Sequence, residues 1–105
     1  MTNQEINHLK NKVSLVARNF LKAKKLLYSC PTLTESNTRM FINYIKAVQQ
    51  AYEKLNEKEK RCLNNEYFFD DKPEWWKPYI NENEFEQLHN QTVIHFMEGF
   101  YASIS

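Results

Sequence analysis

The chain has 105 residues and a formal net charge of +1, and 42% of its residues are apolar and 14% aromatic. This near-neutral charge argues against a large non-specific nucleic-acid footprint, and the single glycine and three prolines argue against turn-rich sheet architectures. We therefore expect one all-α domain over residues 1–105, a bundle of four to five helices.

The first predicted helix runs from about Asn3 to Tyr28, and Pro31 lies just beyond its end. Apolar residues recur along it at steps of three and four, which is typical of a bundle helix. They are Ile6, Leu9, Val13, Val16, Phe20, Ala23 and Leu27. The same segment is basic, through Lys10, Lys12, Arg18, Lys22, Lys24 and Lys25. A membrane-surface role is one interpretation, but the lysines are spread around the helix, which favours an ordinary bundle helix.

The second predicted helix runs from about Leu33 to Leu55, and Thr32 with Glu35 fits a capping box. Its apolar face consists of Phe41, Ile45, Val48, Tyr52 and Leu55. A short break between two long helices predicts an antiparallel hairpin over residues 3–55. Helices with such wide apolar faces also favour self-association, and we expect a dimer formed through this hairpin.

A helix–corner–helix unit is expected over residues 56–105. A short helix from Glu57 to Phe68 or Phe69, capped by Asn56 with Glu59, would bury Cys62 and Leu63. Its solvated face would be Glu57, Lys58, Glu59, Lys60 and Arg61. The unit ends in a long helix from about Glu82 to Ser103, capped by Asn81 with Glu84 or by Asn83 with Glu86. Two adjacent apolar stripes predict that this last helix is central in the bundle or partly covered by another chain.

The corner between these helices contains Pro73 and Pro78 and both tryptophans of the chain, Trp75 and Trp76. Two adjacent indoles are costly to leave in water, since each aromatic side chain buries ~150–250 Å². We expect at least one of them to fill the gap between helices. An exposed indole would be a candidate for contact with a partner, and Phe100 is a further candidate on the last helix.

The stretch from Tyr52 to Leu63 carries a leucine, a capping residue, a charged turn and an apolar pair. It resembles the opening of the region-4-like domains of sigma-70-type factors, and it is similar to small phage-type late transcription regulators of low-GC bacteria. The resemblance covers about the second half of the chain. It implies a helix-turn-helix unit in which residues 57–68 precede a corner and residues 81–88 begin a recognition helix.

Under this resemblance, basic residues near the corner would contact phosphates, and amides on the last helix would read base edges. The phosphate contacts would be Lys58, Lys60, Arg61, Lys72 and Lys77, and the base readers Asn81, Asn83 and Gln87. The chain departs from the family in its longer, proline-rich corner and in the three carboxylates that open the recognition helix, which phosphates would repel. They are Glu82, Glu84 and Glu86.

The pattern gives no indication of catalysis, of a cofactor or of a small-molecule substrate. The potential soft metal ligands show no metal-binding spacing, so no metal is expected. They are His8, His89, His95, Cys30 and Cys62. Two cysteines without a signal peptide predict a reducing cytoplasm, and no apolar run is long enough to span a membrane. The leading hypothesis is a small bacterial or phage regulator that binds DNA or the transcription machinery. The alternative is a protein-binding or self-associating helical module without nucleic-acid contact.

Overall fold

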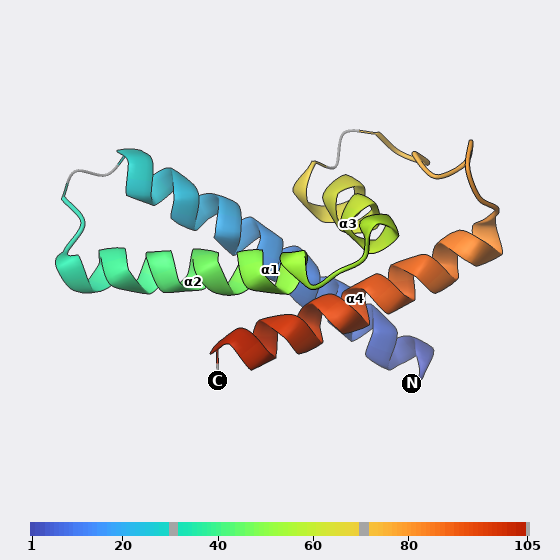
Figure 1. Cartoon of the computed structure of the whole chain (residues 1–105), viewed down its shortest axis with the longest axis horizontal. Helices are drawn as coiled ribbons and strands as arrows, with labels where there is room; N and C mark the ends of the chain where they lie inside the picture. The colour runs from blue at the N-terminus through green and yellow to red at the C-terminus, as the bar shows by residue number, and fades with distance from the viewer. Residues whose placement is uncertain (30–31, 70–71, 105) are drawn as a thin grey trace.

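The computed structural model describes residues 1–29, 32–69 and 72–104, and these residues form helices without any strand. The elements are α1 (Asn3–Ser29), α2 (Glu35–Glu53), α3 (Glu57–Leu63), the π-helical turn η1 (Asn64–Phe68) and α4 (Glu82–Ile104). The predicted all-α bundle is confirmed (Figure 1). The molecule is elongated, with principal extents of 48 × 28 × 23 Å.

The polar residue before each of three helices sets where that helix begins. Asn56 and Glu59 form the predicted capping box of α3, and the Asn81 side chain accepts a hydrogen bond from the Glu84 backbone N–H at 2.8 Å. The capping box predicted for Thr32 is wrong, because α2 starts at Glu35 and Thr34 immediately precedes it. The Thr34 hydroxyl accepts from the Asn37 N–H at 3.1 Å.

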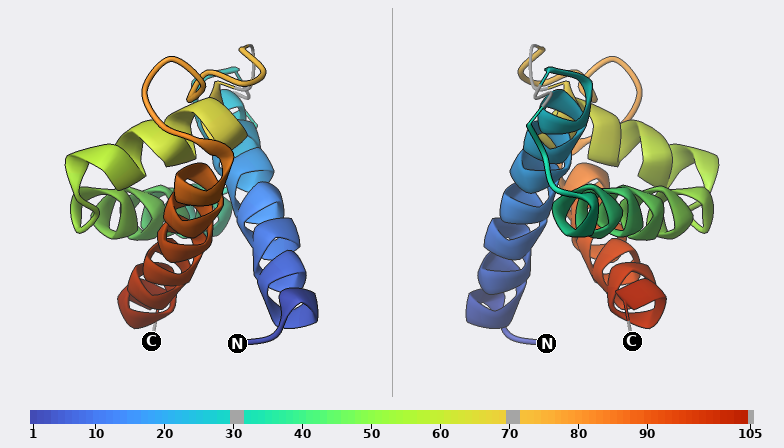
Figure 2. Two further views of the ribbon diagram at one scale, coloured as in Figure 1. Left: turned by 90° about the vertical axis from the view of Figure 1, so that its right-hand side faces the viewer. Right: turned by 90° about the vertical axis from the view of Figure 1, so that its left-hand side faces the viewer.

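The helices α1 and α2 run in opposite directions as the predicted hairpin, and α4 packs against both of them and against α3 (Figures 1 and 2). The prediction that α4 is central is therefore confirmed. The core joins all four α-helices around Val13, Val48, Leu63 and Phe96. The helices α2 and α4 approach closely at Gly99, where an added Cβ would lie 3.2 Å from the Ala51 Cα.

The face of α3 that was predicted to be solvated is partly buried in the structure. Glu59 is only 3% exposed, because α4 covers it and supplies Gln91 and His95 as partners for its carboxylate. Lys60 is also largely covered, with 19% of its side chain exposed. After Leu63 the helix widens into η1, where the Phe69 N–H donates to the Asn64 carbonyl five residues back at 2.7 Å.

The far end of the hairpin extends beyond α3 and α4 (Figure 1). Large apolar side chains are exposed there, including Tyr28 at 87%, Met40 at 59% and Leu21 at 47%. This end of the hairpin consists of α1 and α2 alone, so apolar side chains outside the predicted seam remain in contact with solvent, whereas the seam residues themselves are buried or half-buried.

Candidate partner-binding groove

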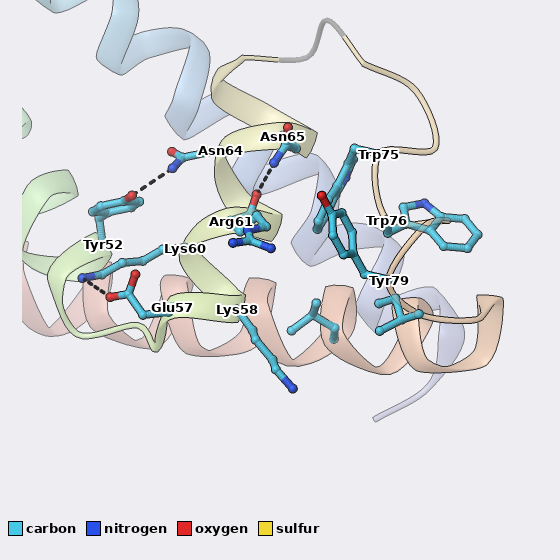
Figure 3. A pocket seen from close by; sticks show the side chains of 12 residues that line it. Tyr52, Glu57, Lys58, Lys60, Arg61, Asn64, Asn65, Trp75, Trp76 and Tyr79 are labelled. Carbon is cyan, nitrogen blue, oxygen red and sulfur yellow. Dashed lines mark hydrogen bonds and ion pairs between the residues drawn. The ribbon is translucent and has the colours of Figure 1, made fainter.

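A groove of about 490 Å³ lies between α3 and the corner of residues 72–81 (Figure 3). We call it the corner groove. Its apolar lining comes from the corner and from α4, and its polar lining comes mainly from α3. Its principal side chains are Lys58, Arg61, Trp75, Trp76, Tyr79 and Ile80. The structure thus places both tryptophans in one groove with three of the five predicted phosphate contacts, Lys58, Lys60 and Arg61.

Short-range backbone contacts give the corner its shape. Pro73 has a restricted φ, and Glu74 adopts a positive φ of 56°, a conformation that non-glycine residues rarely occupy. The chain then turns tightly, with the Trp76 carbonyl accepting from the N–H groups of Tyr79 and Ile80. A residue held at positive φ costs of order 1–3 kcal/mol, and such residues concentrate at functional sites.

Both indoles are half-buried, so the corner is neither pure core nor a fully exposed platform. Trp76 stacks on Phe85 of α4 with ring centroids 4.6 Å apart, and Trp75 meets the same ring edge-on at 6.0 Å. The Trp75 Nε1–H donates to the Glu66 carboxylate at 2.9 Å. These contacts fix the positions of the two rings, and both residues contribute to the lining of the corner groove.

Tyr79 is the most accessible aromatic residue of the corner groove, with 70% of its surface exposed. Its ring faces Arg61 (Figure 3), with the guanidinium carbon 5.7 Å from the ring centroid. Arg61 and Lys58 are both exposed, and neither forms an ion pair with a carboxylate among the described residues. The rim of the corner groove therefore presents an exposed aromatic ring and two cations that have no carboxylate partner among the described residues.

The other predicted phosphate contacts are not equally available. Lys60 pairs with Glu53 at 3.6 Å and Glu57 at 3.7 Å, and Lys77 pairs with Glu74 at 2.8 Å. Lys72 is exposed at the start of the corner. Two of the five cations therefore already have carboxylate partners within the chain.

Of the predicted base readers, Asn81 is engaged as the cap of α4. Asn83 and Gln87 remain exposed on the first turns of α4. The three carboxylates of the same turns, Glu82, Glu84 and Glu86, are exposed as well. The structure does not gather the amides and the cations into one basic surface, because exposed carboxylates flank the amides on the first turns of α4.

Charge is divided sharply between the two halves of the chain. Residues 57–87 contain nine acidic and five basic side chains, whereas residues 1–56 contain nine basic and three acidic ones. The helix–corner–helix unit is therefore net acidic, and the hairpin is strongly basic. Phosphates would be repelled by the first and attracted by the second.

An aromatic stack connects the corner groove to the core. Phe85 lies between Trp76 and His89, and the His89 Nε2 is 2.7 Å from the Tyr67 hydroxyl. Burial, and to a smaller extent the nearby Lys10 ammonium, lowers the pKa of His89 to about 4. The neutral imidazole then accepts the hydrogen bond that the Tyr67 hydroxyl donates.

The buried carboxylate of Glu59 on α3 has no indication in the sequence. Burial favours a higher pKa for Glu59, but hydrogen bonds from the Asn56 N–H, His95 and Gln91 outweigh it and lower the pKa below its usual value. The capping pattern explains only the contact with Asn56. A cue for the α4 contacts is absent from the sequence because they join residues more than thirty positions apart.

Two further residues that the sequence indicates as candidates, Cys62 and Phe100, are buried in the bundle. Burial raises the pKa of the Cys62 thiol to about 12, which keeps it protonated and poorly nucleophilic. Phe100 is only 6% exposed and packs against Tyr44, so the prediction that it contacts a partner is not supported by its position. Across residues 1–29, 32–69 and 72–104, no cluster of three His, Cys, Asp or Glu side chains could hold a metal ion.

No helix among the described residues is both long enough and apolar enough to cross a bilayer. Comparison of the chain with protein-family models, with curated proteins and with solved structures finds no match.

Proposed function

We propose that this protein is a helical interaction module that binds a segment of another protein in the corner groove. The observation that carries the proposal is the pair formed by Tyr79 and Arg61, which stand exposed above a lining of half-buried tryptophans. Tryptophan, tyrosine and arginine are the residues most enriched among those that dominate protein–protein binding energy. The contacts of the two indoles with Phe85 and Glu66 hold their rings in place, which reduces the entropy lost on binding.

The lining of the groove suggests the chemistry of its occupant. Trp75, Trp76 and Ile80 offer an apolar surface, and Lys58 and Arg61 supply positive charge at its rim. A peptide with an aromatic or aliphatic anchor beside a carboxylate would match both features. The anchor would displace water from the indoles, and its carboxylate would pair with Lys58 or Arg61, which form no ion pair with another described residue.

A protein occupant fits the corner groove better than DNA does. The surrounding unit is net acidic, two of its five cations are paired internally, and exposed carboxylates flank the amides of α4. A peptide contacts only the groove, whereas a duplex would extend over these carboxylates. The resemblance to transcription regulators makes a protein of the transcription machinery the first partner class to test.

The proposal is tested by selecting peptides from a random displayed library on the immobilised protein. We expect the selected peptides to share an apolar residue next to Asp or Glu, and to bind Tyr79→Ala and Arg61→Ala at least about 10-fold more weakly. Tyr28→Ala is the matched control, because it removes an exposed tyrosine far from the groove. Equal affinity for all variants would place the binding site elsewhere and reject the proposal.

Self-association through the hairpin is a second candidate function, and a specific observation favours it. Tyr28, Met40 and Leu21 leave apolar surface exposed where the hairpin extends beyond the bundle. A second copy packed there would complete a four-helix arrangement. Sedimentation should then show a dimer that Leu21→Glu or Met40→Glu converts to a monomer, and a monomeric wild-type protein would exclude it.

A further inference from the structure

The outer face of α1 carries one continuous polar stripe. Its residues recur at steps of three and four, so they lie above one another on the helix. They are Asn7, Asn11, Ser14, Arg18, Lys22 and Lys25, and all six are exposed. Figure 2 shows α1 along one flank of the molecule, with no other described helix on its outer side. We call this surface the α1 stripe.

Charge in this region is entirely positive. Residues 6–34 contain six basic side chains and no acidic one. The three carboxylates of the hairpin have local partners: Glu5 contacts Thr2, Glu35 pairs with Arg39, and Glu53 pairs with Lys60. None of them neutralises the α1 stripe.

The six basic residues of α1 divide into two groups. Lys10 and Lys12 are half-buried, Lys12 donates to the Tyr101 hydroxyl at 3.3 Å, and Lys24 lies over the Phe20 ring at 5.2 Å. These three take part in the packing of the bundle. The other three, Arg18, Lys22 and Lys25, point to solvent on the α1 stripe and form no ion pair within the described part of the chain.

We propose that the α1 stripe binds the backbone of double-stranded DNA. The charge complementarity is direct, because Arg18 to Lys25 spans about 10 Å of helix, and a duplex presents roughly six phosphates over that length. Asn7 and Asn11 continue the stripe toward the N-terminus, and their side chains can donate to phosphates or to base edges. The major groove of B-form DNA admits a helix, whereas that of duplex RNA is too narrow.

An anionic membrane fits this surface less well. Membrane-surface helices insert an apolar face, but the apolar face of α1 is buried against α2 and α4. The exposed Leu15 and Leu21 lie on opposite sides of the α1 stripe and do not form one insertion face. The DNA surface inferred here also differs from the predicted recognition helix, because it lies on the basic half of the molecule.

The test compares three proteins by anisotropy of a labelled 20-base-pair DNA duplex between 50 and 200 mM salt. The stripe variant combines Arg18→Gln, Lys22→Gln and Lys25→Gln. The matched corner variant combines Lys58→Gln, Arg61→Gln and Lys72→Gln, so both variants lose three positive charges. Glutamine is a good helix former, and circular dichroism at equal concentration confirms that all three proteins are folded.

Three phosphate contacts predict a log–log salt slope near −2.7 for the wild type, which is roughly a 40-fold loss of affinity between 50 and 200 mM salt. The stripe variant should lose on the order of 10-fold or more in affinity at 50 mM salt, with a flatter slope, while the corner variant stays within about two-fold. An equal loss in both variants would overturn the proposal. The proposal also fails if the wild type does not bind at 50 mM, if it prefers a duplex RNA of the same sequence, or if it binds only anionic vesicles.

Discussion

Lowering the pH from 7 to 5 should destabilise the protein through His89. This ring is packed between Phe85 and Tyr67, and the fold lowers its pKa from the ordinary 6.5 to about 4. Above pH 6.5 both the folded and the unfolded state hold the imidazole neutral, so the full stability is present. As the pH falls from 6.5 toward 4, the unfolded chain takes up a proton that the folded protein does not, and stability is lost.

The size of this effect follows from the interval between the ordinary pKa of 6.5 and the final pH of 5. Each pH unit in that interval corresponds to about 1.4 kcal/mol, so a completely buried imidazole would lose about 2 kcal/mol. The His89 side chain is only partly buried, and solvent screening reduces the expected loss to about 1 kcal/mol. A loss of that size lowers the melting temperature by about 4–8 °C in a domain of this length.

The assay is urea unfolding of the wild type and of His89→Gln at pH 7 and pH 5. Glutamine cannot titrate but keeps an acceptor for the Tyr67 hydroxyl, so the variant should show about 1 kcal/mol less pH dependence than the wild type. The difference between the two proteins removes the contributions of all groups that both proteins retain. If the two proteins lose equal stability, the assignment of a neutral His89 to the fold is wrong.

Three further predictions concern the core. Phe96→Ala removes a fully buried ring and should lower the free energy of unfolding, measured in urea, by about 3–5 kcal/mol. A loss below about 1 kcal/mol would show that this ring is not central to the core. Gly99→Leu should lower the melting temperature more than Gly99→Ala, because even a Cβ at this position would lie 3.2 Å from the Ala51 Cα. Equal melting temperatures of the two variants would contradict this close approach of α2 and α4. Cys62 should react with a disulfide reagent only when the protein unfolds, as measured in a Cys30→Ser background, and rapid reaction of the folded protein would contradict its burial.

Much of the fold was predictable because it depends on local patterns. The bounds of α1 and α4 follow from apolar periodicity, and the capping pairs of Asn56 and Asn81 place the starts of α3 and α4 correctly. The start of α2 was misplaced because threonine occurs at both 32 and 34, and capping chemistry alone does not choose between them.

The remaining features depend on contacts between distant segments. The burial of Glu59 requires Gln91 and His95 from α4, and the widening at η1 has no residue signature in the sequence. The sequence indicates the tryptophans and the basic residues of α3 as candidate contacts, but for different roles, and it predicts no groove between them. Their juxtaposition depends on the path of the corner, and the pairing of Tyr79 with Arg61 could not be read from the sequence.

The most direct test of the corner groove as a protein-binding site uses the two indole N–H signals in an NMR spectrum of ¹⁵N-labelled protein. Both tryptophans of the chain line this groove, so their two signals report on it. Titration with a selected peptide should shift at least one indole signal in the wild type, with a weaker response at the same peptide concentrations in Arg61→Ala. A peptide that binds with both indole signals unchanged would contradict the proposed site.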